Sequence, residues 1–328
     1  MIVAVAGGAG GVGKTILEKL LQKSRFKVIV LSRSVCGLEQ SMILSPILND
    51  FQEPREDIVL QKAQHVQLDY DDIASMTTEL ERHNIHTIIS AIGIVSDESS
   101  QSQLNLIEAA EKAKCTERFI PSEYSFIQTA DLLPLDPSIQ YWLDAANRLK
   151  SSSLKYTRVI PGFFMDYWGM PHVKTYLQPY TFGINIAEGK ASIPGDGNDV
   201  ICMTYTADMA TYMTKLLDLD EWSEFTVIVG DEVTYNQLIS MSEEICGKRF
   251  EVHYDSFDRI YSGDVTVPPM PDGTEYAETE TKEITKLVSL LTVHGVFDLP
   301  KEGRLNARFP DVQPITMKQF LIDAWRKN

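Results

Sequence analysis

A glycine-rich loop near the start of the chain is the feature that most constrains its fold. The apolar segment Ile2–Ala6 reads as a strand, and the loop GGAGGVGKT (residues 7–15) follows it directly. Apolar residues then recur at helical spacing over residues 16–21. Such a strand-to-helix turn presents backbone N–H groups and the positive end of the helix dipole to an anion. The loop therefore predicts a phosphate-binding site at the beginning of an α/β domain.

Three phosphate-binding patterns fit this loop. From Gly8 onward it matches the P-loop GxxxxGK[ST], in which backbone N–H groups surround phosphates and the lysine reaches the terminal ones. Gly8, Gly10 and Gly13 match GxGxxG, whereas Gly7, Gly10 and Gly13 match the GxxGxxG spacing of extended and atypical short-chain reductases. The loop alone leaves open which phosphate is bound.

The end of the second expected strand favours a dinucleotide. Arg33 follows the β-branched segment Lys27–Leu31, about twenty residues after the loop. At this position of a dinucleotide-binding fold, an arginine accommodates the 2′-phosphate of NADP, whereas an acid would bind the ribose of NAD. Asp69, just after a weak third strand, is expected to meet the adenine amino group. A nucleoside triphosphatase needs an apolar strand that ends in a magnesium-binding aspartate, and TIISAIG (residues 87–93) ends without one. We therefore expect NADP(H) as the cofactor, and Lys14 and Thr15 on the helix surface.

Strand-like and helix-like segments alternate through the first half of the chain. Further strands are expected over residues 66–68, 87–92, 118–120 and 156–160, and a helix over 103–113. This alternation builds a doubly wound parallel sheet, Rossmann-like, with ligands at the carboxyl ends of its strands. The pattern becomes irregular after Pro161, and residues 263–280 read either as a solvated connector or as a lid. We expect one domain over residues 1–160 and a second over 161–328, with some of its strands returning to the main sheet.

Composition excludes several classes of protein. Thirty Lys and Arg against 46 Asp and Glu give a net charge of −16, which provides no general field for attracting a nucleic-acid backbone. No apolar run approaches the roughly 18 residues of a membrane span, and the N-terminus lacks the basic region of a signal peptide. The cysteines form no CxxC motif, so no metal site is expected. We expect a cytoplasmic protein with a small-molecule substrate, and its oligomeric state is left open.

Motifs along nearly the whole chain resemble those of one family. They are GGAGGVG (residues 7–13), LSR (31–33), ERFIPSEYS (117–125), YTRVIPGFFMDY (156–167), GDGN (195–198) and RFPD (308–311). The chain resembles the NmrA-like branch of the atypical short-chain dehydrogenases, near the isoflavone-reductase-like proteins, and its version of the motifs is most similar to fungal members, many of which belong to secondary-metabolite pathways. The resemblance implies an NADP-binding Rossmann-like domain, a smaller α/β C-terminal substrate domain and a pocket between them.

The family's residue roles carry over by motif position. The pyrophosphate would lie on the glycine loop and the 2′-phosphate on Arg33, while residues 91–92 line the nucleotide and residues 121–122 lie near the nicotinamide. The expected cofactor-binding residues are Gly7, Ala9, Gly10, Gly11, Val12, Gly13, Arg33, Asp69, Ala91, Ile92, Pro121 and Ser122. The substrate pocket is expected to involve Trp142, Phe163, Phe164 and Tyr167, although Phe163 and Phe164 read equally well as core residues.

One position departs from the family. The isoflavone-reductase-like enzymes carry a lysine as general acid about fifteen residues before the threonine of the YT strand, and here that position is Trp142, which cannot transfer a proton at neutral pH. The YxxxK pair of short-chain dehydrogenases is missing as well. Tyr124 and Asp166 are the candidate catalytic replacements, with a helix or turn cap as the alternative role of Asp166. Lys150 and His172 are expected to be ordinary surface and loop residues.

Two functions agree with these features. The first is an NADP(H)-dependent oxidoreductase that acts on a bulky natural-product intermediate in a secondary-metabolite pathway without the family's lysine, including redox-assisted isomerisation or cyclisation. The second is a non-catalytic NADP-binding redox sensor of the NmrA type that regulates a partner protein. The aromatic-rich segment 156–168 favours the first, because it is typical of a small-molecule pocket.

Overall fold

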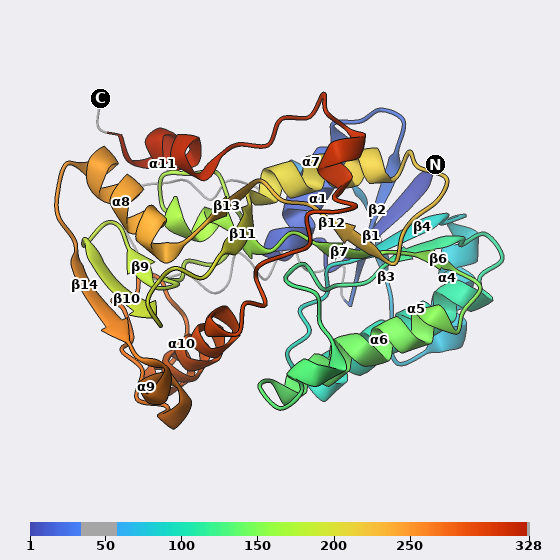
Figure 1. Cartoon of the computed structure of the whole chain (residues 1–328). Coiled ribbons are helices and arrows are strands. Elements are labelled where there is room, and N and C mark those ends of the chain that lie inside the picture. The colour runs from blue at the N-terminus through green and yellow to red at the C-terminus, as the bar shows by residue number, and fades with distance from the viewer. Residues whose placement is uncertain (34–57, 327–328) are drawn as a thin grey trace, which may run out of the picture. The chain divides into compact units, whose positions relative to one another are not determined.

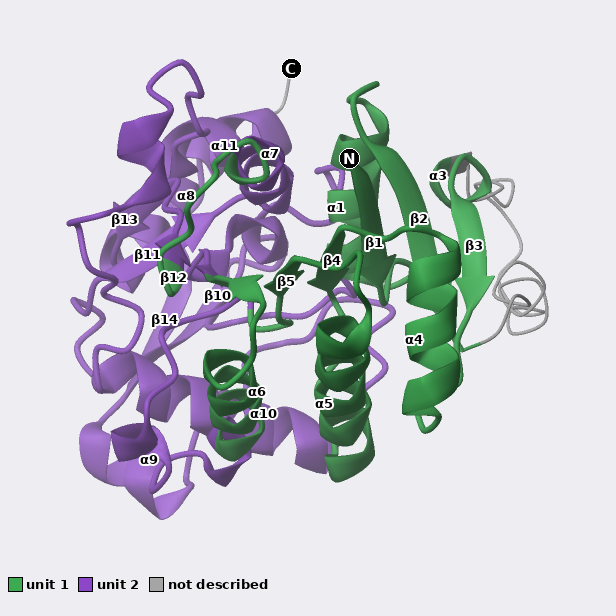
Figure 2. Cartoon of the chain, turned by 90° about the vertical axis from the view of Figure 1, so that its right-hand side faces the viewer, with its two compact units in different colours: residues 1–123, 140–158, 216–225 green, residues 124–139, 159–215, 226–328 purple. Residues whose placement is uncertain are grey.

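The chain divides into two compact units, each discontinuous in sequence (Figure 2). The computed structural model describes residues 1–33 and 58–326. The first unit comprises Met1–Glu123, Gln140–Arg158 and Leu216–Phe225, and the second comprises Tyr124–Ile139, Val159–Lys215 and Thr226–Asn328. The sequence-based domain boundary at residues 160/161 stays a prediction, and these units are defined by contacts instead.

A six-stranded sheet in the order β3-β2-β1-β4-β5-β6 forms the first unit, and all of its pairings are parallel. Its strands are β1 (Ile2–Ala6), β2 (Lys27–Ser32), β3 (Gln64–Gln67), β4 (Thr87–Ser90), β5 (Arg118–Ile120) and β6 (Lys155–Tyr156). This order is that of a doubly wound dinucleotide-binding sheet, in which the strand order reverses between β1 and β4. The expected fold class is confirmed.

Helices cover both faces of this sheet (Figure 1). The helices α4 (Ile73–Arg82), α5 (Asp97–Lys112) and α6 (Gln140–Lys150) lie on one face, and α1 (Gly11–Leu21) lies on the other and contacts the short α3 (Ile58–Gln61). The central strands β1 and β4 are almost entirely buried, and most of their residues are apolar, because both faces of the sheet are covered. The core therefore holds the carboxyl ends of β1, β2 and β4 in fixed positions.

The strand expected over residues 156–160 is split in two. Lys155–Tyr156 joins the main sheet as β6, whereas β7 (Arg158–Ile160) pairs with β12 (Phe225–Val227) in a separate two-stranded sheet. The change of partner falls at Thr157, because the next backbone N–H, that of Arg158, donates to the carbonyl of Glu224 at 2.8 Å.

The second unit contains two three-stranded sheets. One has the order β13-β11-β8, from β8 (Phe163–Phe164), β11 (Ile201–Thr204) and β13 (Asp231–Val233), and the other has the order β14-β10-β9, from β9 (Ile184–Asn185), β10 (Lys190–Pro194) and β14 (Glu251–Asp255). Its helices are α7 (Thr206–Leu216), α8 (Tyr235–Cys246), α9 (Phe257–Ser262), α10 (Glu278–Val293) and α11 (Met317–Trp325). Within residues 58–326, no strand after β7 pairs with a strand of the six-stranded sheet, but β12 pairs with β7, which follows β6 after one residue. The expected return of later strands to the main sheet stays a prediction. None of the described helices is both long enough and apolar enough to cross a membrane.

Candidate nucleotide-binding site

The glycine loop connects β1 to α1 through a tight turn. Gly7 has a left-handed backbone (φ +74°), and its carbonyl accepts the N–H of Gly10 at 3.0 Å. Gly10 is the N-cap of α1, and no side chain caps the helix there. The first-turn N–H groups of a helix have no partner within the helix. The loop thus directs backbone donors and the positive end of the α1 dipole toward one place.

The three glycines of the GxxGxxG pattern have different steric surroundings. A Cβ atom on Gly7 would lie 2.4 Å from the carbonyl oxygen of Ala91, and one on Gly13 would lie 2.2 Å from the carbonyl oxygen of Gly7. A Cβ atom on Gly10 would meet only the Gly7 oxygen, at 3.5 Å, which is an ordinary contact. The fold itself therefore requires glycine at positions 7 and 13. At Gly10 the missing side chain instead leaves the backbone accessible from outside, as the close approach of a pyrophosphate requires.

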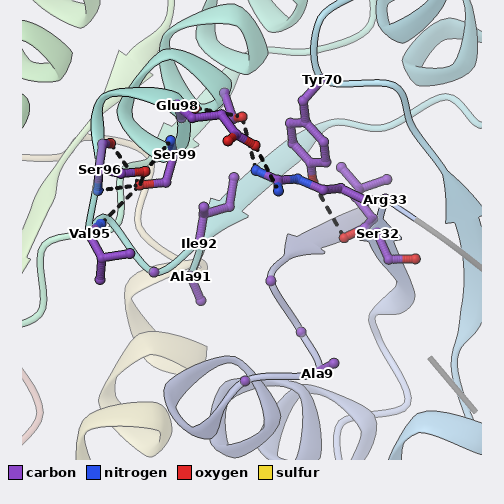
Figure 3. Close-up of a pocket in the computed structure, with 16 residues that line it drawn as sticks. Ala9, Ser32, Arg33, Tyr70, Ala91, Ile92, Val95, Ser96, Glu98 and Ser99 are labelled. Atoms are coloured by element: carbon purple, nitrogen blue, oxygen red, sulfur yellow. Dashed lines mark hydrogen bonds and ion pairs between the residues drawn. The ribbon is translucent and has the colours of Figure 1, made fainter. Parts of the chain in front are cut away.

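A cavity of about 480 Å³ opens beside this loop, at the carboxyl ends of β1, β2 and β4 (Figure 3). This is the point where the strand order reverses, and doubly wound sheets bind their ligands there. The residues that line it are Gly7, Gly8, Ala9, Gly10, Leu31, Ser32, Arg33, Tyr70, Ala91, Ile92, Gly93, Val95, Ser96, Glu98, Ser99 and Ser102. Six of the expected cofactor-binding residues, namely Gly7, Ala9, Gly10, Arg33, Ala91 and Ile92, are among them.

Thr15 is the last residue of the P-loop pattern in this loop. It is buried, only 4% exposed, and its hydroxyl donates to the carbonyl of Gly11 at 3.0 Å. The expectation that Thr15 lies on the helix surface is therefore wrong, since its face of α1 packs inward. A P-loop would place this hydroxyl on a magnesium ion. In this structure the hydroxyl is bonded within its own helix, as Ser and Thr hydroxyls commonly are.

Arg33 lies at the end of β2 and faces α5 across the cavity (Figure 3). Its guanidinium donates to the Glu98 carboxylate at 3.3 Å and to the Ser102 hydroxyl at 3.2 Å. Gln67 donates to the Arg33 carbonyl at 3.0 Å, which holds the backbone in place. The side chain of Arg33 is 56% exposed, so a ligand can reach it.

The other expected cofactor residues lie outside this lining. Asp69 lines an adjoining recess of about 300 Å³ that shares Arg33 and Tyr70 with the main cavity. Gly11, Val12 and Gly13 form the first turn of α1. Pro121 and Ser122 follow β5 and are buried, and the Ser122 N–H donates to the Gln103 side chain at 2.8 Å. The roles of these residues toward a cofactor stay predictions.

Sequence reasoning missed the wall formed by the N-terminus of α5. Ser96 and Ser99 cap that helix reciprocally, and the Ser99 hydroxyl also accepts the N–H of Val95 at 2.9 Å (Figure 3). Tyr70 completes the wall; burial raises the pKa of its hydroxyl well above the usual range. The capping-box pattern of Ser96 and Ser99 was the available signal, but it marks a helix start and not a cavity.

A buried ion pair fixes the segment that follows β5. Arg158 donates to the two carboxylate oxygens of Glu123 at 2.6 and 2.7 Å, and both side chains are at most 4% exposed. The guanidinium also lies over the ring of Phe225, 4.6 Å from its centroid. The pair ties Glu123, just after Ser122, to the start of β7, so it stabilises the edge of the sheet expected near the nicotinamide.

The two candidate proton donors are both buried within the second unit. Asp166 is fully buried and accepts hydrogen bonds from the Thr175 hydroxyl, at 2.6 Å, and from the hydroxyl and N–H of Thr206, at 2.6 and 3.0 Å. Burial raises the pKa of Asp166, although these hydrogen bonds oppose the shift. Since Thr206 begins α7, this geometry favours the capping role. Tyr124 has a left-handed backbone (φ +35°) and is 7% exposed, and burial raises the pKa of its hydroxyl.

The four candidate substrate residues are divided between the units. Trp142 lies half-buried on α6 in the first unit. In the second unit, Phe163 packs against the rings of Phe182, Phe297 and Trp168, with centroids 4.9 to 5.2 Å apart. Tyr167 also joins this aromatic cluster. Phe164 follows Phe163 in β8 and is buried as well. These contacts account for Phe163 as a core residue, and the pocket role of all four stays a prediction.

Across residues 1–33 and 58–326, no group of three or more His, Cys, Asp or Glu side chains could hold a metal ion. The cavity is lined by the backbone of the glycine loop, by small and apolar side chains, and by Tyr70, Arg33 and Glu98.

The strand order, the glycine loop and the cavity at the switch point define a doubly wound α/β protein with a nucleotide-type site. The chain belongs to the NmrA-like family, whose family model matches residues 1–312. It is 27% identical to the oxidoreductase swnN of Metarhizium robertsii, over 99% of this chain and 97% of that protein. It is 32% identical to the oxidoreductase BOA1 of Botryotinia fuckeliana, over 76% and 77% of the two chains.

Among solved structures, the fold is similar to one described as AtPrR2 with NADP+ and (+)pinoresinol. The TM-score is 0.72 at 19% identity, and the match covers 98% of this chain and 97% of the other. The resemblance inferred from the motifs is confirmed at the level of the family and of the fold.

Proposed function

We propose that the protein binds NADP(H) in the cavity at the carboxyl ends of β1, β2 and β4 and acts as an NADP(H)-dependent oxidoreductase. The observation that carries the proposal is the open surroundings of Gly10, the one glycine of the GxxGxxG pattern that packing does not require. The names of the fungal relatives, both oxidoreductases, support the activity, and the NADP+ complex of the structural neighbour supports the cofactor.

The residues of the cavity have distinct tasks toward such a cofactor. The N–H groups at the start of α1 would bind the pyrophosphate, and Arg33 would donate to the 2′-phosphate. Ala91 and Ile92 would lie along the nucleotide, and Asp69 would accept from the adenine amino group in the adjoining recess. The bound nicotinamide supplies the hydride chemistry, while the protein binds and orients it.

The proposed substrate is a bulky, largely apolar natural-product intermediate. We assign its contacts to Trp142, Phe163, Phe164 and Tyr167, and we take Trp142 to stand where related enzymes carry a lysine. Of the candidate proton donors Tyr124 and Asp166, Asp166 is already engaged, because its oxygens accept three hydrogen bonds. Conjugated or iminium-like substrates need no strong acid, and neither does a redox-assisted isomerisation or cyclisation.

Parallel titrations with NADPH, NADH and ATP test the nucleotide assignment. Nicotinamide fluorescence follows the two dinucleotides, and calorimetry follows ATP. We expect saturable binding of NADPH, weaker binding of NADH and the weakest binding of ATP. Tightest binding of ATP would instead support the P-loop reading and remove the proposed function.

A non-catalytic NADP-binding sensor is the second candidate. The observation that favours it is the engagement of Asp166 as a helix cap, together with a tryptophan at the expected position of the lysine. A redox sensor should bind NADP+ and NADPH with clearly different affinities and should transfer no hydride. Single-turnover oxidation of bound NADPH, followed by nicotinamide absorbance over a panel of conjugated and iminium compounds, separates the two functions. Oxidation by any of them, absent in Gly10→Ala, supports the enzyme.

A further inference from the structure

Glu98 neutralises the arginine on which the NADP assignment rests. Its carboxylate lies 3.3 Å from the Arg33 guanidinium, and both side chains line the main cavity (Figure 3). Both are also largely exposed, at 56% for Arg33 and 78% for Glu98, so the pair forms at the solvent-facing side of the site. Ser102 binds the same guanidinium from the next turn of α5.

The charge around Arg33 is predominantly negative. The adjoining recess is lined by Arg33 and by three acids, Asp69, Asp71 and Glu98, and Arg33 is the only cation among its described lining residues. Asp69 already accepts the N–H of Asp71 at 3.0 Å, and of the three acids Glu98 forms the ion pair with Arg33. A dianionic 2′-phosphate that approaches Arg33 must therefore displace this carboxylate or lie beside it, and like charges at such distances repel.

We propose that Glu98 is a specificity-determining residue that reduces the protein's discrimination between NADP(H) and NAD(H). The inference rests on the proposed function and deepens it. Arg33 favours the 2′-phosphate, and Glu98 offsets part of that preference by competing for the guanidinium and by repelling the phosphate. The ribose of NAD(H) carries no 2′-phosphate, so it neither competes with Glu98 for the guanidinium nor is repelled by the carboxylate, and NAD(H) also binds. Cofactor choice is thereby set by two side chains that come from opposite walls of the cavity.

Two nucleotide fragments isolate the effect of the 2′-phosphate. Adenosine 2′,5′-bisphosphate and adenosine 5′-monophosphate differ only in that group, so the ratio of their dissociation constants measures its recognition. We expect Glu98→Gln to tighten binding of the bisphosphate by about two- to fivefold, since an exposed ion pair contributes up to about that factor. Binding of the monophosphate should stay unchanged, and added salt should narrow the difference between variant and wild type.

A matched control removes the same charge from the same helix. Glu108 lies ten residues further along α5, about 15 Å away at 1.5 Å per residue, and pairs with Lys112 outside the cavity. Glu108→Gln should leave both dissociation constants unchanged. A Glu98→Gln variant that changes both fragments equally, or neither, overturns the inference while the nucleotide site stands. If neither fragment binds the wild type, the proposed function fails, and the inference fails with it.

Discussion

Replacing Gly10 with alanine should separate cofactor binding from folding. The new Cβ would have one neighbour within 4 Å, the Gly7 carbonyl oxygen at 3.5 Å, and the backbone of Gly10 (φ −79°, ψ 169°) suits alanine. Alanine is a poorer N-cap than glycine but restricts the unfolded chain, and these effects oppose each other, so the free energy of unfolding should change by less than about 1 kcal/mol. The methyl group would occupy the place where the pyrophosphate meets the backbone. NADPH affinity should therefore fall at least about tenfold, which corresponds to roughly 1.4 kcal/mol.

Gly13→Ala is the matched comparison within the same loop. Its Cβ would lie 2.2 Å from the Gly7 oxygen and 2.9 Å from the Gly8 Cα, so backbone must move. Overpacking of this kind costs about 1–3 kcal/mol of stability. Urea unfolding followed by tryptophan fluorescence measures stability, and NADPH titration measures binding. A Gly10→Ala protein that binds NADPH like the wild type would refute the placement of the pyrophosphate, and a fully stable Gly13→Ala protein would refute the packing argument.

Substitutions at four further positions test the cofactor site, the buried ion pair, the helix cap and the substrate pocket. In titrations, Arg33→Ala should weaken NADPH binding by about tenfold and change NADH binding by no more than about twofold, because only NADPH loses a charge-assisted hydrogen bond to its phosphate. Equal losses of affinity for both cofactors would contradict the role of Arg33. Arg158→Met should lower the free energy of unfolding by about 3–5 kcal/mol in urea, because the buried Glu123 carboxylate would lose its guanidinium partner. A neutral change would contradict this. Burial raises the pKa of Asp166. The stability of the wild type relative to Asp166→Asn should therefore be highest below pH 4 and decline as the pH rises through the raised pKa. Unfolding measured as a function of pH would show this decline, and the opposite slope would show a lowered pKa. Trp142→Lys should not speed single-turnover hydride transfer, because an amine placed at this half-buried position is partly desolvated. Trp142→Phe should retain most activity. A faster lysine variant would show that the protein is a disabled lysine-dependent enzyme.

Local patterns were enough to predict the main sheet. The apolar run Ile2–Ala6, the glycine loop and the β-branched segment after Lys27 are contiguous signals, and they place Gly7, Gly10 and Arg33 around one cavity. The split at Thr157 had no local signal, because no glycine or proline interrupts the run from Lys155 to Ile160. It depends on pairing with Glu224, far along the chain.

Long-range contacts also determine the parts of the site that the sequence does not predict. In the sequence, Glu98 is only an acidic residue near the start of a helix, and the fold brings it to Arg33. Thr15 looked like a surface residue beside Lys14, yet its face of α1 is buried. The segment 216–225 joins the first unit through contacts such as that of Arg118 with the carbonyls of Leu217 and Leu219, at 3.3 and 3.0 Å. No pattern within ten or twenty residues contains such information.

A crystal structure of the protein with NADP+ tests the central claim most directly. We predict that the pyrophosphate lies against the backbone of the loop at Gly10 and the N-terminus of α1, with the 2′-phosphate within hydrogen-bond distance of the Arg33 guanidinium. NADP+ bound elsewhere, or a cavity without nucleotide at saturating NADP+, would contradict the account.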